Sequence, residues 1–206
     1  DFDELVLADI VEPVERSGDP RIKTRKVDLA DTSAMEALVE ERTGVVFHLA
    51  AVVSSQAEAD FDLGWRVNVD AARNLLELCR HARARIRFIF ASSLAVYGGA
   101  LPRIVDDSTA VTPQSSYGME KAIGELMVND YSRRNFIDGC VLRLPTICVR
   151  PGKPNRAASS FVSSIIREPL NGEAAVCPVP PDFPLWLSGP ETAIRNLIHA
   201  MGMDTN

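Results

Sequence analysis

Residues 86–93 read IRFIFASS and residues 117–121 read YGMEK, and these two stretches decide the fold that we expect. The first is a short apolar run that ends in two serines, which is typical of a buried strand in a parallel sheet. The second begins a segment in which apolar residues recur at helical spacing as far as about Arg134. Because ligands of such sheets lie beyond the carboxyl ends of the strands, Ser93 and Tyr117 are expected at one edge of the sheet.

Strands and helices are predicted to alternate along the chain. Four apolar runs have the length and β-branched content of buried strands: residues 5–8, which end at Asp9, and residues 45–50, 86–91 and 140–144. Helical patterns cover residues 61–82 and 117–134. The alternation predicts an α/β fold with a Rossmann-type, doubly wound parallel sheet.

Helix ends are marked by capping residues. A helix between the first two strands is predicted to start with a capping box of Ser33 and Glu36 and to end at Gly44. The last helix is predicted to start at Ser188, with Pro190 in its first turn. Because prolines become frequent after Arg150, we expect a Rossmann-like domain at residues 1–150 and a partial substrate-binding lobe at residues 151–206.

Composition excludes several classes of protein. The 206 residues are 46% hydrophobic and 24% charged with a formal net charge of −6, which disfavours nucleic-acid and anionic-membrane partners. No apolar run approaches the ~20 residues of a membrane helix, and the first residues do not resemble a signal peptide, so we expect a cytoplasmic protein. The four cysteines lack metal-ligand spacing, so we expect buried free thiols and no metal site.

Tyr117 and Lys121 stand four residues apart and therefore share one face of the predicted helix. The ammonium group of Lys121 is expected to favour the ionised phenol, and Ser93 is placed to donate a hydrogen bond to a substrate oxygen. Tyrosine and lysine at this spacing also occur on ordinary exposed helices. The surrounding motifs decide between the two interpretations.

These motifs resemble those of the extended short-chain dehydrogenases/reductases, which include NAD-dependent sugar-nucleotide epimerases and dehydratases. The resemblance rests on FHLAA at residues 47–51, NVD at 68–70, SSLAVYG at 92–98, YGMEK at 117–121 and LPT at 144–146. It implies that Ser93 is the catalytic serine, Tyr117 the general base and Lys121 the lysine that activates it. It also implies an NAD site and a homodimer. The implied NAD contacts are Leu49, Ala50, Ala51, Asn68, Ser92, Tyr117, Lys121, Pro145 and Thr146.

Within this family, the segments at residues 48–56, 65–70 and 142–155 are most similar to the D-erythronate dehydrogenases. That group oxidises a small sugar acid with NAD. We expect Ser54 and Ser55 to hydrogen-bond a polyol, together with Ser93 and Tyr117. Arg150 is our choice to pair with the substrate carboxylate, with Arg143 as the alternative.

Asp9 favours NAD over NADP. A carboxylate at the tip of the second Rossmann strand accepts hydrogen bonds from the adenosine ribose and repels a 2′-phosphate. Asp28 and Leu29 resemble the pair that contacts the adenine edge. The alternatives are a helix cap for Asp9 and a turn residue for Asp28.

One departure from the family pattern is the absence of a glycine-rich G-x-G-x-x-G loop. The chain begins just before the expected second strand, so the first strand and its loop are expected to be missing, and the carboxyl end also stops early. Their loss would leave unpaired strand edges in the middle of the sheet. Two other functions stay open, a sugar-nucleotide 4-epimerase or dehydratase and a non-catalytic NAD-sensing protein on the same fold.

Overall fold

The computed structural model describes residues 2–150 and 159–204. Its strands are β1 (Leu5–Asp9), β2 (Ile22–Lys26), β3 (Val45–His48), β4 (Arg87–Ser93), β5 (Asp138–Leu144), β6 (Thr146–Ile147) and β7 (Leu187–Ser188). Its helices are α1 (Thr32–Glu36), α2 (Ser54–Ala59), α3 (Phe61–Gly64), α4 (Ala71–His81), α5 (Ser116–Arg133), α6 (Ser160–Leu170) and α7 (Pro190–Gly202). A π-helical segment, η1 (Trp65–Asp70), joins α3 to α4, and a 3₁₀ turn, η2 (Leu94–Val96), follows β4.

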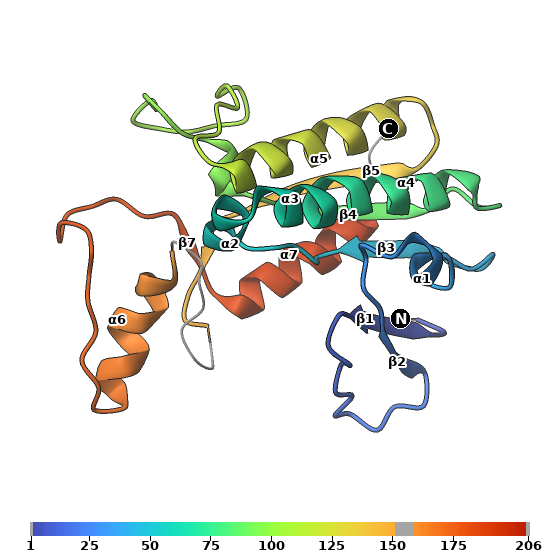
Figure 1. Ribbon diagram of the computed structural model, residues 1–206, viewed down its shortest axis with the longest axis horizontal. Helices are drawn as coiled ribbons and strands as arrows, with labels where there is room; N and C mark the ends of the chain where they lie inside the picture. The colour runs from blue at the N-terminus through green and yellow to red at the C-terminus, as the bar shows by residue number, and fades with distance from the viewer. Residues whose placement is uncertain (1, 151–158, 205–206) are drawn as a thin grey trace.

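β4 is the centre of a three-stranded parallel sheet in the order β3-β4-β5. Every residue of β4 except Ser93 is buried. Figure 1 shows why: α4 and α5 cover one side of this sheet and α7 lies on the other. Burial on both faces accounts for the nearly unbroken apolar run of β4.

The hydrophobic core lies between β4 and the helices that cover it. Its buried members are Met35, Ala71, Leu75, Leu76, Cys79, Ile86, Phe88, Phe90, Val128 and Ile137. Fully burying an aliphatic or aromatic side chain contributes ~1.5–3 kcal/mol. This cluster therefore fixes α4 and α5 on the sheet that carries the expected site.

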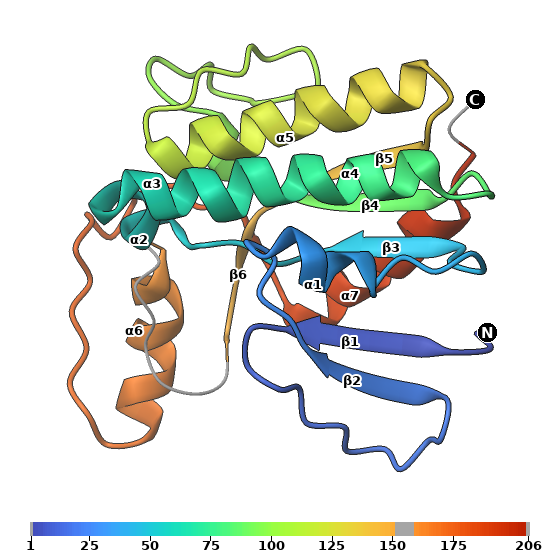
Figure 2. The same ribbon diagram turned by 45° about the vertical axis from the view of Figure 1, so that its right-hand side comes forward.

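β1 and β2 form a separate parallel pair. β1 lies beside β3 and points in the same direction, below it in Figure 2. In the described part of the chain, no ladder of hydrogen bonds joins β1 to β3. The predicted α/β fold with parallel sheets is confirmed, whereas the absence of a first strand between them stays a prediction.

β2 was not predicted, because its sequence IKTRK contains three basic residues and no apolar run. The two ends of β1 also differ from expectation. Leu5 to Leu7 are only half-buried, and Ala8 and Asp9 are exposed. The strand therefore forms where predicted but is not buried.

The predicted helix caps need correction at both ends of the chain. Asp31, not Ser33, caps α1, since its side chain accepts hydrogen bonds from the backbone N–H groups of Ser33 and Ala34. The helix ends near Ala37, far short of Gly44. At the last helix the cap position is Gly189, which has no side chain, while Ser188 belongs to β7.

The elements after residue 158 lie in two different places in the molecule. α7 packs against the main sheet, where the Nε of buried Arg87 donates to the carbonyl oxygen of Ala200 at 3.1 Å. β6 and β7 form a second small parallel pair, and α6 stands away from the main sheet (Figure 1). The proposed boundary at residue 150 stays a prediction, but α7 covers the sheet of the first region.

No helix in residues 2–150 and 159–204 is long and apolar enough to cross a membrane.

Of the four cysteines, Cys79 is buried and Cys177 is exposed, so the expectation of buried thiols is wrong for Cys177.

Candidate active site

Ser93 and Tyr117 meet at the carboxyl end of β4. Ser93 is the last residue of β4, and Tyr117 lies in the first turn of α5, whose N-cap Ser115 accepts a hydrogen bond from Gly118 N at 3.1 Å. Gly118 allows this arrangement, because a Cβ there would overlap the carbonyl group of Ala95 in the turn after Ser93. The glycine thus lets α5 begin directly against the serine-bearing turn.

The phenol of Tyr117 is hydrogen-bonded to the side chain of Ser93. Burial raises the pKa of Tyr117 above its usual value of 10.0, the hydrogen bond to Ser93 opposes this, and the charge of Glu120 adds to it. We expected the pKa of this phenol to be lowered by Lys121. Instead the net shift is upward, because burial outweighs the hydrogen bond with Ser93.

Lys121 is buried beneath Tyr117. Its Nζ donates to the carbonyl oxygen of Ala91 at 2.9 Å and lies 5.8 Å from the centroid of the Tyr117 ring and 4.8 Å from that of Phe90. Burial lowers the pKa of Lys121 from 10.5 to about 8, and the charge of Glu120 opposes the shift. Lys121 therefore still carries an ammonium group at neutral pH, close to the Tyr117 ring. This ammonium group loses its proton at a lower pH than that of an ordinary lysine.

His48 ends β3 beside this group. Its ring stacks on Phe90 with centroids 5.7 Å apart, and only 3% of its surface is exposed. Burial, with a smaller contribution from the charge of Lys121, lowers the pKa of His48 to about 3. His48 is therefore a packed residue at the end of a strand, and its imidazole stays neutral throughout the physiological range.

The predicted NAD contacts follow the carboxyl ends of the strands. Asp9 ends β1, Asp28 and Leu29 follow β2, residues 49–51 follow β3, and Pro145 and Thr146 follow β5. Figure 2 shows β1 and β3 ending at the same edge. An elongated dinucleotide that lies across this edge fits such an arrangement.

Asp9 and Asp28 are both exposed and both cap short turns. Asp9 Oδ1 accepts from Val11 N at 2.9 Å, and Asp28 Oδ1 accepts from Ala30 N at 2.9 Å. Each carboxylate keeps a second oxygen with which it could accept from a ribose or an adenine. Leu29 is packed against the hydrophobic core, so only part of its side chain remains for a ligand.

Three other predicted NAD contacts are engaged within the protein. Ser92 donates to Glu125 Oε1 at 2.5 Å, and the backbone N–H of Thr146 donates to Trp186 O at 3.1 Å. Asn68 binds the backbone of Val52 through both its side-chain oxygen and its side-chain nitrogen. The side chains of Ser92 and Asn68 are therefore held by hydrogen bonds within the protein, at the edge of the sheet.

The predicted substrate contacts are less closely grouped. Ser54 and Ser55 open α2, which packs beside the start of α5, where Glu58 accepts from Ser116 N at 2.9 Å. The backbone of Arg150 is held against α6 by Ser163 and Arg167. No described contact brings the Arg150 guanidinium to Tyr117.

Sequence reasoning missed a network around Arg143. The Arg143 guanidinium contacts both carboxylate oxygens of Glu125, with Nη2 to Oε2 at 2.7 Å, and its Nη1 donates to the hydroxyl of Tyr97 at 2.5 Å. The hydrogen bonds to Glu125 raise the pKa of Arg143 further. This engagement argues against Arg143 as the partner of a substrate carboxylate, and nothing in the spacing of the sequence marked Glu125 as its partner.

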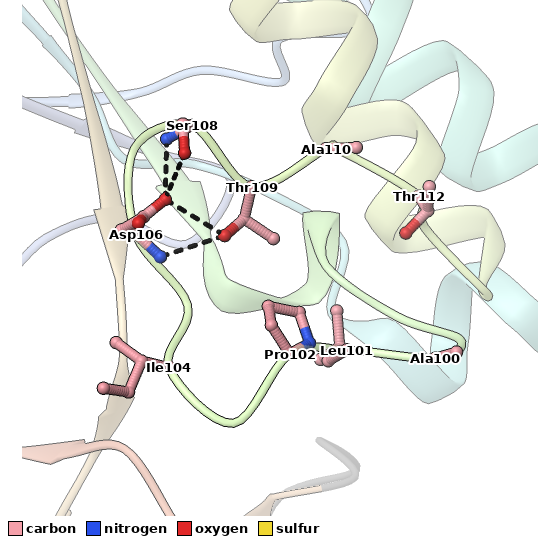
Figure 3. A pocket seen from close by; sticks show the side chains of 9 residues that line it. All are labelled: Ala100, Leu101, Pro102, Ile104, Asp106, Ser108, Thr109, Ala110 and Thr112. Carbon is pink, nitrogen blue, oxygen red and sulfur yellow. Dashed lines mark hydrogen bonds between the residues drawn. The ribbon is translucent and has the colours of Figure 1, made fainter.

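The loop between β4 and α5 encloses a hollow of about 390 Å³ (Figure 3). Asp106 organises the loop by accepting from Ser108 and Thr109. The described residues that line the hollow do not include Ser93, Tyr117 or Lys121. The hollow therefore belongs to the loop and is separate from the catalytic group.

The fold and this site define a family. The model of the NAD dependent epimerase/dehydratase family matches residues 6–203. The chain belongs to this family, and the family predicted from the motifs is confirmed.

Its similarity to particular members is high. The chain is 56% identical to D-erythronate dehydrogenase of Haemophilus influenzae, covering 97% of this chain and 64% of that protein. It is 59% identical to D-erythronate dehydrogenase of Cupriavidus necator, covering 96% of this chain and 60% of that protein. The predicted likeness to this group is confirmed, and the chain spans 60% to 64% of the length of these two relatives.

A solved structure shows the same arrangement. The chain superposes on a nucleoside-diphosphate-sugar epimerase from Agrobacterium tumefaciens with a TM-score of 0.92 and 46% identity. The match covers 98% of this chain and 60% of that one.

Proposed function

We propose that the protein is an NAD-dependent dehydrogenase that oxidises a secondary hydroxyl of a small sugar acid such as D-erythronate. The observation that carries the proposal is the group of Ser93, Tyr117 and Lys121 at the carboxyl end of β4. The identity of 56% and 59% to two D-erythronate dehydrogenases supports the substrate class.

Tyr117 is the proposed general base. In the oxidation, the substrate hydroxyl gives its proton to the Tyr117 phenolate while the carbon loses a hydride and becomes a carbonyl. The nicotinamide of bound NAD supplies the hydride acceptor. Ser93, which already contacts the phenol, is placed to donate a hydrogen bond to the same substrate oxygen.

Lys121 has two proposed roles. Its ammonium group favours the phenolate form of Tyr117 through charge, an effect that grows as water is excluded from the site. Its hydrogen bond to Ala91 O also fixes the first turns of α5 against β4. Because burial and the charge of Glu120 both raise the pKa of Tyr117, the charge of Lys121 is needed for the base to work near neutral pH.

NAD is the proposed cofactor, since the residues present fit it. Asp9 would accept hydrogen bonds from the adenosine ribose, Asp28 and Leu29 would contact the adenine, and residues 49–51 with Pro145 and Thr146 would line the nicotinamide half. A 2′-phosphate beside Asp9 would be repelled. We therefore expect NAD to be preferred to NADP.

A sugar-nucleotide epimerase is the second candidate, favoured by the 46% identity to the Agrobacterium tumefaciens structure. It would use the same three side chains. We favour a sugar acid because identity to the D-erythronate dehydrogenases is higher. Arg150 remains our choice for the carboxylate, and a homodimer and a cytoplasmic location stay predictions from the sequence.

An activity assay of the full-length protein tests the proposal. Formation of NADH is followed with D-erythronate, other four-carbon sugar acids and UDP-glucose as substrates. We expect turnover of D-erythronate with NAD and little or none with NADP. Epimerisation of UDP-glucose without sugar-acid turnover would favour the second candidate, and binding of NAD without turnover of any substrate would indicate a non-catalytic protein.

A further inference from the structure

Glu120 lies inside the YGMEK motif but has no role in the proposed proton transfer. Its side chain is completely buried, with 0% of its surface exposed. Oε2 accepts a hydrogen bond from Asn68 Nδ2 at 2.6 Å, whereas Oε1 has no hydrogen-bond partner among the described residues. A buried carboxylate with one partner is costly, so a compensating function is expected.

Asn68 links Glu120 to the backbone that follows β3. Its Oδ1 accepts from Val52 N at 2.8 Å, and its Nδ2 donates to Val52 O at 3.0 Å. The second hydrogen of Nδ2 points to Glu120. Glu120 is thus the acceptor for the amide hydrogen of Asn68 that Val52 does not bind.

The local backbone is shaped to admit this contact. Asn68 lies in η1, a π-helical segment, and such segments occur frequently at functional sites. On the other side of the carboxylate is Gly64, where an added Cβ would overlap Glu120 Oε1. The glycine and the π-helical segment together leave room for a carboxylate between α3, η1 and α5.

Neighbouring groups act on the pKa of Glu120 in opposite directions. Burial raises the pKa of Glu120, the hydrogen bond from Asn68 and the charge of Lys121 oppose the rise, and the charge of Glu58 on α2 adds to it. The hydrogen bond from Asn68 thus favours the charged form of Glu120, which is the form that accepts it.

We propose that Glu120 is a positioning residue that, through Asn68, holds the segment after β3 at a fixed place relative to the first turn of α5. The inference rests on the proposed function, because that segment contains residues 49–51, the expected NAD contacts, and α5 carries Tyr117 and Lys121. Three hydrogen bonds, two between Asn68 and Val52 and one between Asn68 and Glu120, join the cofactor side of the site to the helix that carries its base. Small displacements at such a junction reduce rates strongly.

Three variants of the native-length protein separate the hydrogen bond from other effects. Glu120→Met keeps most of the volume and removes the acceptor, and Glu120→Gln keeps an acceptor oxygen for Asn68. Asp130→Asn removes an exposed carboxylate from the same helix, where Asp130 pairs only with exposed Arg133 in the described ion pairs, and serves as the control. The measurements are hydrogen exchange of the Val52 amide and the dissociation constant of NAD.

We expect exchange at Val52 to quicken about tenfold in Glu120→Met and NAD to bind about tenfold more weakly, the scale of one buried N–H left without a partner. Glu120→Gln should stay within about threefold of the wild type in both measurements, and Asp130→Asn should match the wild type. If Glu120→Met does not fold, Glu120→Ala replaces it with the same expected values.

Unchanged Val52 exchange in Glu120→Met would overturn the proposal, as would a Glu120→Gln variant as impaired as Glu120→Met. Neither measurement needs substrate turnover. If the wild type binds NAD but does not oxidise D-erythronate, the proposed substrate fails while the role of Glu120 is still decided. If the wild type does not bind NAD, the proposed function fails and Val52 exchange alone decides.

Discussion

β4 and β1 are both parallel strands that end at the proposed cofactor edge, yet their surroundings differ. Six of the seven residues of β4 are buried, whereas no residue of β1 is. α5 and α7 pack on β4, while β1 pairs only with β2 in the described chain. The residues proposed for proton transfer therefore stand on the well-packed part of the molecule, and Asp9, proposed for ribose recognition, stands on the loosely packed part.

The largest expected effect compares the two strands directly. Phe88→Ala removes a fully buried ring from β4 and should lower the free energy of unfolding by ~3–5 kcal/mol. Leu5→Ala in half-buried β1 should cost less than ~2 kcal/mol. Urea denaturation of both variants checks this, and equal losses would mean that the two strands are equally packed.

A pH dependence of stability distinguishes buried Lys121 from surface lysines. Because its folded pKa of about 8 lies below the ordinary value of 10.5, the unfolded chain holds more protons between these values. Through this group, the free energy of unfolding therefore increases as pH rises from about 8 towards 10.5.

Lys121→Met should remove this gain, so the wild type should improve relative to the variant over that window. Melting temperatures from pH 7.5 to 10.5, with exposed Lys26→Met on β2 as the control, test it. A constant difference between wild type and Lys121→Met at every pH would contradict the account.

A smaller loss of stability is expected where α3 meets α5. Gly64→Ala places a methyl group against the Glu120 carboxylate and should cost ~1–3 kcal/mol through overpacking. Gly44→Ala is the matched control, because an added Cβ there has nothing within 4 Å. Equal changes in thermal stability for the two variants would contradict the tight packing around Glu120.

The smallest effect is expected on the β1 side. Asp9→Asn should leave stability and kcat unchanged while it reduces the preference for NAD over NADP, which should be about tenfold or more in the wild type. Titration of both dinucleotides against wild type and variant measures this. A preference that survives the substitution would remove Asp9 from cofactor selection.

The sequence predicted those parts whose signal is local. The span of α5 and the presence of β4 follow from apolar spacing, and Ser93 and Tyr117 follow from their place at element ends. The difference in burial between β1 and β4 could not be predicted, because both are short apolar runs and burial depends on what packs against them from distant segments. β2 was missed because pairing with β1, and not its own composition, makes it a strand.

The polar interior was also beyond local patterns. Glu120 and Glu125 lie on a helix where a carboxylate is normally solvent-exposed, and their partners Asn68 and Arg143 are 52 and 18 residues away. Asp31, and not the predicted Ser33, caps α1, because either residue type can cap a helix and the backbone geometry determines which one does.

The central claim is that Tyr117, on the packed side of the site, is the general base. The most direct measurement is kcat on D-erythronate together with the dissociation constant of NAD for wild type and Tyr117→Phe. We expect kcat to fall by ~10²-fold or more, the usual contribution of a positioned base, while NAD affinity stays within about threefold. Wild-type turnover in Tyr117→Phe, on a substrate that the parent oxidises, would contradict the account.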